Sequence, residues 1–261
     1  MRRLVVSLLV VFLGVWALAQ TADEILKRVE EQGFFGIGQK FLYAALTVEI
    51  QEKGQPPVDY AFRVWAKEYP DETTKVLLLY AAPEDVAGTI FLVHVPKEGT
   101  PRMWLYLPEL ALTKELVSET ERKGEFVAGS GITYEDLSKG YSYRGDYASE
   151  LLGEEEFLGF PTWKLGLSPK VSGAEWSQIL LWVHREHYFV VRAEFYDKDG
   201  KLSRVLIVPE LVTDELGPRP ALLQVENRAK ESWGQVQILE RSAAEIPDEY
   251  FAPESLGKLS L

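Results

Sequence analysis

The sequence contains no cysteine and only three histidines, and basic residues are in short supply. Without cysteine the chain has no disulfide and no thiol chemistry, and it cannot carry the lipidated cysteine of a lipoprotein, so its stability depends on its core. Lysine and arginine number 28 against 40 aspartates and glutamates, a formal net charge of −12. Nucleic-acid binding needs basic side chains to neutralise phosphates. An acidic protein is also repelled by anionic membrane surfaces. We therefore expect no nucleic-acid partner.

An apolar run at the N-terminus is the clearest targeting signal. Arg2 and Arg3 precede the run from Leu4 to Ala19, which ends in the small residues Ala17 and Ala19. The run is shorter than the roughly 20 residues that a membrane-spanning helix needs. The pattern predicts a signal peptide at residues 1–19 that is cleaved before Gln20. Residues 20–261 are then one exported, soluble domain; the alternative is an uncleaved anchor.

One amphipathic helix is predicted directly after this run. Thr21 and Glu24 have the spacing of a capping box. Apolar residues follow at helical spacing, namely Ala22, Ile25, Leu26 and Val29. They lie on one face of a helix, and glycines at 33, 36 and 38 are expected to end it.

The rest of the chain has mainly strand patterns. Alternating apolar and polar residues predict half-buried strands at 42–51 and 60–67. Further candidates are 74–81, 89–95, 102–107, 111–117, 147–158, 162–168, 177–184, 187–197, 201–209, 221–229 and 232–241. Asp197 to Lys201 is a hairpin turn signal, and 247–256 reads as a terminal turn or short helix. The short connections favour an antiparallel meander.

Several of these strands are apolar without alternation: 76–80, 90–93, 103–107, 179–183 and 205–208. Such runs indicate that both faces of a strand are covered, yet the sequence predicts little helix to cover them. Two interpretations remain open from the residues alone. In one, the sheet packs on itself as a closed core; in the other, its concave face forms an apolar cavity under a partial lid.

The segment from Met103 to Leu137 is the most informative part of the chain. An apolar strand stops at Pro108, and a glycine-punctuated flap with Gly124, Gly129 and Gly131 surrounds Phe126 and Val127. Thr133 has the position of an N-cap, with Asp136 three residues on, and predicts a short helical turn. Strand, flap and turn together are the layout of a covered pocket. The expected lid residues are Phe126, Val127, Ile132, Tyr134 and Leu137.

No group of residues has the pattern of a catalytic site. Ser130 does not fit the Gly-x-Ser-x-Gly pattern of a nucleophile elbow, because Ala128 stands two positions before it. His184 and His187 flank a predicted turn rather than one face of a helix, which favours a turn over a metal site without deciding metal binding. His94 is expected to be a satisfied core histidine. We expect a protein without enzyme activity, cofactor or metal.

Several motifs resemble a known family. They are Asp85–Thr89, Trp104–Pro108, Arg122–Gly124 with Gly131, Thr133–Leu137, Phe195–Lys201, and Ile246 and Pro247 with Phe251. Together they cover most of the chain after residue 21. In these motifs the sequence resembles the outer-membrane lipoprotein-sorting-like proteins, distant relatives of the periplasmic lipoprotein carrier LolA and its receptor LolB.

The resemblance implies a mainly β (α+β) fold. This is a single, strongly curved antiparallel half-barrel of about eleven strands, with an N-terminal helix and a short helical lid. It also implies a monomeric periplasmic carrier that holds lipid or lipoprotein acyl chains in a lidded cavity and passes them to a membrane partner, an inner-membrane transporter or an outer-membrane acceptor. Strand parity gives the expected cavity residues as Leu46, Val48, Phe62, Val64, Leu78, Met103, Leu105, Leu181, Val191 and Phe195. Lipoprotein carriers hold their lid with a polar contact, for which Arg63 is a candidate.

Two other functions are compatible with the sequence. A protein of the same fold could be an envelope sensor that regulates a membrane partner. A lipid hydrolase is disfavoured because no nucleophile and base are paired in the sequence. The identity of the lipid and of the membrane partner does not follow from the residues.

Overall fold

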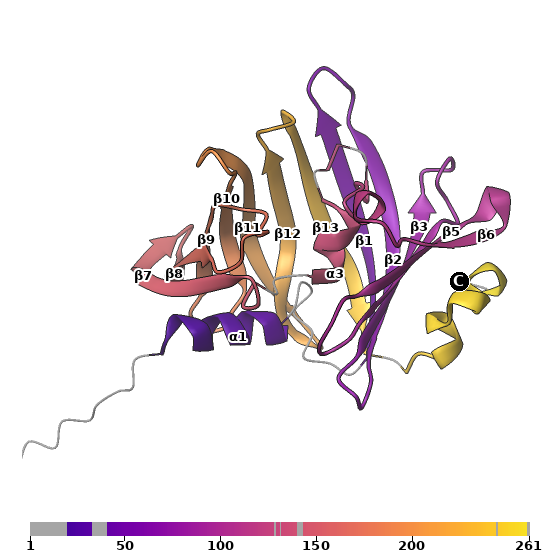
Figure 1. Ribbon diagram of the computed structural model, residues 1–261, viewed down its shortest axis with the longest axis horizontal. Helices are drawn as coiled ribbons and strands as arrows, with labels where there is room; N and C mark the ends of the chain where they lie inside the picture. Colours follow the sequence, from indigo (N-terminus) through magenta and orange to yellow (C-terminus); the bar gives the residue numbers. More distant parts are fainter. Residues whose placement is uncertain are drawn as a thin grey trace, which may run out of the picture.

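A computed structural model describes residues 20–32, 41–127, 129–130, 132–139, 143–243 and 245–259. The predicted signal peptide and the glycines at 33, 36, 38 and 131 lie outside these residues. Within them, thirteen strands form one sheet (Figure 1). The strands are β1 (Phe41–Glu52), β2 (Val58–Glu68), β3 (Thr74–Ala82), β4 (Ile90–Val95), β5 (Arg102–Leu107), β6 (Leu112–Glu115), β7 (Tyr147–Phe157), β8 (Phe160–Pro169), β9 (Gln178–His184), β10 (Val190–Tyr196), β11 (Leu202–Asp214), β12 (Gly217–Asn227) and β13 (Ser232–Ser242).

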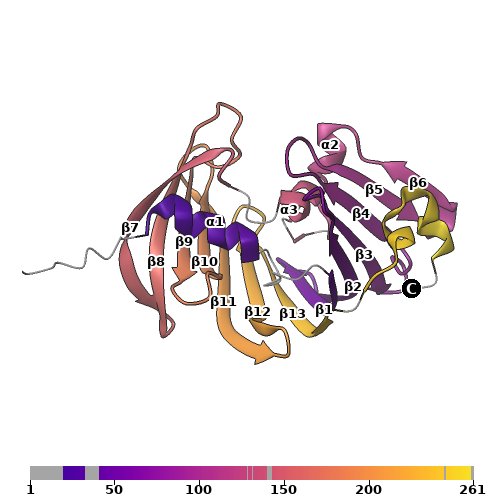
Figure 2. The same ribbon diagram turned by 90° about the horizontal axis from the view of Figure 1, so that it is seen from below.

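The sheet is antiparallel throughout and consists of two meanders. The spatial order is β6-β5-β4-β3-β2-β1-β13-β12-β11-β10-β9-β8-β7. The chain runs outward from β1 to β6, crosses to the opposite edge, and returns from β7 to β13, which pairs with β1. Seen from below, the sheet bends into a trough with β7–β10 in one wall and β2–β5 in the other (Figure 2). We call the inside of this trough the concave face.

The helical segments are few and lie on both sides of the sheet. They are α1 (Ala22–Gln32), η1 (Pro108–Leu110), α2 (Glu119–Arg122), α3 (Tyr134–Lys139), η2 (Asp248–Phe251) and η3 (Pro253–Lys258). Inside the trough, α1 crosses the wall that contains β7–β10, and α3 lies against the other wall (Figure 2). The C-terminal segments η2 and η3 pack outside, on the convex face of β3 and β5.

The helix α1 forms as the sequence predicts. The backbone N–H of Glu24 donates to Thr21 Oγ1 over 3.2 Å, and the backbone N–H of Thr21 donates to a carboxylate oxygen of Glu24 over 2.8 Å. This reciprocal capping box satisfies two free N–H groups at the start of the helix. The apolar stripe is buried, with Ile25 and Leu26 fully inaccessible to solvent. Burial of a leucine or isoleucine side chain stabilises the fold by about 1.5–3 kcal/mol.

The doubly apolar strands β3–β5 are covered on both faces. Leu78 of β3 pairs with Phe91 of β4 on the concave face, under the segment that contains α3. On the convex face, Leu77 and Leu92 pack against Trp104 and the C-terminal segment. The residues of that segment in the cluster are Ile246, Phe251 and Leu256. In β3–β5 the continuous apolar runs therefore lie where helical segments cover both sides of the sheet.

Most of the fold expected from the sequence is confirmed, but the number of strands is not. The fold is mainly β, its antiparallel sheet is curved and open, and the expected N-terminal helix is present. The expectation of about eleven strands is wrong. Every range with a strand pattern joins the sheet, including the short edge strand β6, which pairs with β5 through four residues. The hairpin turn at Asp197–Lys201 and the C-terminal helical turns form as predicted.

Candidate functional site

The ten residues expected to line a cavity share the concave face. Eight of them belong to one buried cluster that also contains the stripe of α1. These eight are Leu46, Val48, Phe62, Val64, Leu78, Leu181, Val191 and Phe195. Met103 lies in the adjoining cluster around Phe91, and Leu105 packs against that cluster while half-buried. The structure therefore brings together a continuous apolar surface from both walls of the trough.

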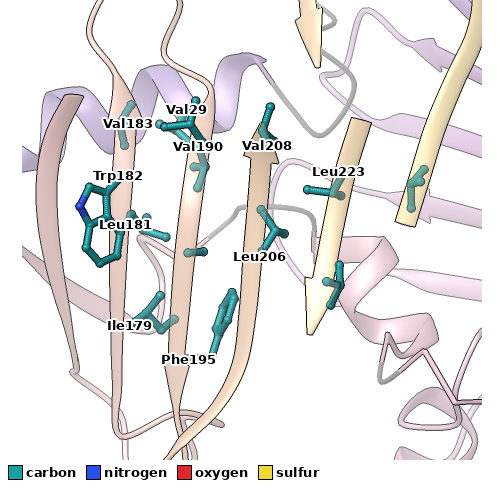
Figure 3. Packing of buried hydrophobic residues seen from close by; sticks show 14 of the residues in the cluster. Val29, Ile179, Leu181, Trp182, Val183, Val190, Phe195, Leu206, Val208 and Leu223 are labelled. Carbon is teal, nitrogen blue, oxygen red and sulfur yellow. The ribbon is translucent and has the colours of Figure 1, made fainter. Parts of the chain in front are cut away.

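One wall of this surface is seen in Figure 3. Val29 of α1 lies near the side chains of β9 and β10, such as Val183 and Val190, while Leu206, Val208 and Leu223 continue the surface across β11 and β12 (Figure 3). All six are buried. In this structure α1 thus covers the wall near β7 with apolar side chains.

The opposite wall is covered by the segment 118–139, which we call the lid. Its first turn, α2, starts with a capping box in which Ser118 and Glu121 bond reciprocally. This geometry, with Lys114 beside it, lowers the pKa of Glu121 to about 2, the largest cause being the hydrogen bond from Lys114. A short bridge then joins Glu125 to Thr133, and α3 follows directly. The helical turn predicted near Thr133 is therefore confirmed.

The expected lid residues point into the trough. The ring of Phe126 lies 5.1 Å from the rings of both Phe62 and Tyr80 and 6.0 Å from that of Tyr134. Val127 is buried beside it, and Ile132, Tyr134 and Leu137 pack against the same cluster while partly exposed. Phe126 thus contacts Phe62, one of the predicted cavity residues. The lid and the sheet form one apolar interface.

Polar contacts join the lid to β3 and to the turn between β12 and β13. The hydroxyl of Tyr80 in β3 donates to the carbonyl oxygen of Phe126 over 2.6 Å, and burial raises the pKa of Tyr80, which keeps it a donor. At the turn between β12 and β13, Lys230 pairs with Glu125 at 2.6 Å. The hydroxyl of Ser232 donates to the carbonyl oxygen of Gly129 over 2.6 Å.

Arg63, the possible counterpart of the carriers' lid contact, does not lie at the lid. Arg63 pairs with Ala45 and Leu79 in the sheet, while its neighbours Phe62 and Val64 are buried in the concave cluster. Because side chains alternate along a strand, Arg63 lies on the convex face, away from the lid. Sequence reasoning missed Tyr80, Lys230 and Ser232. Lys230 is 105 residues from its lid partner, so no local pattern marks the pair.

A polar pocket of about 340 Å³ lies where the lid approaches β11 and the β12–β13 turn. Basic side chains of Lys123, Arg204 and Lys230 line it together with the acidic Glu125, Glu135 and Glu175. The guanidinium of Arg204 also stacks over the rings of Trp176 and Phe195, at 5.1 and 5.6 Å from their centres. Through Phe195 this pocket adjoins the apolar cluster of the concave face. Its acidic and basic side chains therefore form a charged rim beside that cluster.

Other residues considered from the sequence have structural roles. Ser130 donates to the carbonyl oxygen of Val127 over 2.6 Å within the lid. His94 bonds to the carbonyl oxygen of Phe251, as expected of a satisfied core histidine. His184 accepts backbone N–H groups of the β9–β10 turn, and burial lowers its pKa. In the part of the chain that the structure describes, no three acidic, histidine or cysteine side chains gather as a metal site.

No helix among the described residues is both long enough and apolar enough to cross a bilayer. The structure thus contains two features that could bind a ligand. One is the apolar interface between the concave face and its covers, and the other is the charged rim beside the lid.

Comparisons with known proteins identify the fold. A family model described as an uncharacterized protein matches residues 72–258. A DUF1329 family protein from Desulfovibrio piger is 21% identical, with 89% of this chain and 96% of that chain covered and a TM-score of 0.78. A candidate outer membrane lipoprotein-sorting protein domain from Vibrio parahaemolyticus is 24% identical, with coverage of 90% and 97% and a TM-score of 0.77.

A LolA superfamily protein from Nitrosomonas europaea is 18% identical, with coverage of 90% of this chain and 98% of that chain and a TM-score of 0.66. No curated protein matches the chain. The coverage shows that the likeness extends over most of the chain. The chain therefore belongs to the family of uncharacterized proteins whose model matches residues 72–258, and it has the fold of the lipoprotein-sorting and LolA superfamily structures.

Proposed function

We propose that this protein is an exported, non-enzymatic carrier that binds lipid acyl chains between its concave face and its lid. The observation that carries the proposal is the apolar interface between Phe126 and Val127 of the lid and the strands beneath them. Removing apolar surface from water is worth about 25 cal/mol per Å². An acyl chain that replaces Phe126 and Val127 on the concave face would keep this apolar surface out of contact with water.

The proposed mechanism is exchange between the lid and the cargo. In the closed structure Phe126 occupies the concave face itself, against Phe62 and Tyr80. When the lid moves outward, the same side chains become available to an acyl chain, and the charged rim receives the polar head. Release follows when a membrane partner binds the chain more tightly. The ten cavity residues predicted from the sequence are the proposed contacts, among them Leu181, Val191 and Phe195.

The proposal includes the location of the protein. The chain would be exported, processed before Gln20, and active as a monomeric domain of residues 20–261 in the periplasm. Its fold is shared with a lipoprotein-sorting candidate and a LolA superfamily protein, which supports a role in the envelope. N-terminal sequencing of protein recovered from the envelope tests the processing site. A chain that retains Met1 in a membrane fraction would contradict it.

A disulfide that locks the lid tests the function directly, because the chain has no cysteine of its own. A Cβ atom at Gly129 would lie 2.6 Å from Cγ of Glu52 in β1, so cysteines at the two positions would be near enough to join after a small shift of the lid. The double variant Glu52→Cys and Gly129→Cys therefore joins the lid to the sheet when it is oxidised. The left-handed backbone at Gly129, with φ of 79°, costs a cysteine about 1–2 kcal/mol, so thermal unfolding of both redox forms is the control for folding.

The measurement is titration with a fluorescent fatty acid, oxidised and then reduced. The oxidised variant should bind at least about tenfold more weakly than the wild type, and reduction should restore the affinity. The same protein before and after reductant is the matched pair. If the fully oxidised, folded variant bound the fatty acid as tightly as the wild type, the acyl chain would not enter beneath the lid.

A further inference from the structure

A second pocket lies on the convex face, separated by the sheet from the lid. Its volume is about 460 Å³, within the usual range for small-molecule sites. The outer faces of β2–β4 form its floor, and the turn η1 and the C-terminal segment η3 form its sides. Leu79, Ile90 and Leu256 supply apolar wall, and Arg63 is the one charged side chain among its lining residues.

Two sequence motifs that the lid does not use meet at this outer pocket. Asp85–Thr89 contributes Ala87 and Gly88, and Trp104–Pro108 contributes Tyr106 and Pro108. The two motifs touch closely, since a Cβ atom at Gly88 would lie 3.4 Å from Cγ of Pro108. The C-terminal segment closes on them as tightly, because a Cβ atom at Gly257 would lie 2.9 Å from the ring of Tyr106. The pocket is therefore built from several chain segments that are distant in sequence.

Arg63 is exposed, and its side chain forms no ion pair or hydrogen bond with any other residue that the structure describes. This is notable in a chain with 40 acidic and 28 basic residues, where Lys67, Arg102 and Arg241 each have a carboxylate partner. The hydroxyl of Tyr106 likewise has no hydrogen bond to another described residue. One pocket thus contains a guanidinium and a phenol hydroxyl with unused donors beside apolar walls.

We propose that the outer pocket binds a small amphiphilic anion. Its carboxylate or phosphate head would bond to Arg63 and Tyr106, because the guanidinium fork matches the oxygens of both groups. Its short apolar tail would lie against Leu79, Ile90 and Leu256. A cation of the same size has no acidic side chain among the lining residues to receive it. This site is independent of acyl binding under the lid.

The test is isothermal titration calorimetry with three eight-carbon probes: octanoate, octyl phosphate and octyltrimethylammonium. Wild type is compared with Arg63→Gln, which removes the charge, and with Ala81→Trp, which fills the pocket from its exposed rim. Arg185→Gln is the matched control. It makes the same charge change at the β9–β10 turn, where Arg185 pairs with Glu154. The oxidised Glu52→Cys and Gly129→Cys protein reports on binding with the lid closed.

At least one anionic probe should bind wild type, Arg185→Gln and the locked protein with the same affinity. Whether octanoate or octyl phosphate binds more tightly shows whether the pocket prefers a carboxylate or a phosphate. Arg63→Gln and Ala81→Trp should each bind it at least about tenfold more weakly, the loss expected for a charge-assisted hydrogen bond. The cationic probe should not bind the outer pocket. Unchanged affinity in Arg63→Gln, no anion binding to wild type, or loss of binding on locking the lid would overturn the proposal. The first of these results leaves acyl binding under the lid untouched.

Discussion

At the scale of single residues, an ion-pair network joins the turn of the β11–β12 hairpin to β13. Arg241 of β13 is almost fully buried and donates to both carboxylate oxygens of Asp214, over 2.8 and 2.9 Å. Arg219 donates to the same carboxylate over 2.8 Å. The hydrogen bonds from Arg241 above all hold the pKa of Asp214 well below its ordinary value. Geometry of this kind fixes the orientation of a charged pair as well as its energy.

Replacing this carboxylate should destabilise the fold. In Asp214→Asn the buried guanidinium of Arg241 loses its counter-charge and one acceptor, which costs about 1.5–3 kcal/mol of the free energy of unfolding. Urea unfolding at neutral pH measures the loss. Glu231→Gln is the control, because its ion pair with Lys53 is exposed on both sides and should contribute little. If the free energy of unfolding fell no further in Asp214→Asn than in Glu231→Gln, this account of the ion pair would be contradicted.

The pH dependence of that loss has a defined sign. Because the pKa of Asp214 is lowered in the folded state, its contribution is complete above the unfolded value of about 3.9 and is lost as the pH falls toward the folded value. The stability difference between wild type and Asp214→Asn should therefore narrow from pH 6 to pH 3. A difference that widens on acidification would show that the carboxylate is not the group responsible.

At the scale of elements, the lid is held by packing and by a few polar contacts to the β12–β13 turn. The ion pair between Lys230 and Glu125 is partly exposed and should contribute little. We therefore attribute most of the free energy that stabilises the closed lid to the burial of Phe126 and Val127. The hydrogen bond from Ser232 to the carbonyl oxygen of Gly129 is buried. It should contribute about 0.5–1.5 kcal/mol to closure.

Removing that hydrogen bond should open the lid more often without unfolding the sheet. In Ser232→Ala, hydrogen exchange at the backbone N–H of Phe126, which bonds to Ile132 inside the lid, should quicken by about twofold to tenfold. Glu231→Gln changes the adjacent residue, whose side chain pairs with Lys53, and should leave the lid amides unchanged. Equal exchange in both variants would mean that the turn does not hold the lid.

Elements defined by local pattern were predictable from the sequence, and contacts across the trough were not. The capping box and stripe of α1 lie within eleven residues, and strand alternation placed Phe62 and Val64 together. The same alternation places Arg63 outside, which rules it out as a lid contact. The polar contacts that hold the lid join residues that are 46 to 105 positions apart in the sequence. They depend on the bend of the sheet, which no local pattern specifies.

At the scale of the whole molecule, thirteen strands bend around an apolar interior covered by α1 and the lid. The C-terminal segment covers the opposite face of β3–β5, so these strands are apolar on both sides. The alternative left open by the sequence, a core closed by the sheet alone, differs from this arrangement. Here the concave face is closed by separate segments, and one of them is held by contacts that can break without disturbing the ladders.

The central claim is that an acyl chain lies between the lid and the concave face, and photo-crosslinking tests it most directly. A fatty acid with a diazirine at the end of its chain would be bound, irradiated, and located by mass spectrometry of peptides. The account predicts crosslinks to concave residues such as Leu181, Val191 and Phe195, and their loss in the oxidised, lid-locked variant. Crosslinks confined to the convex face, or unchanged by the lock, would contradict it.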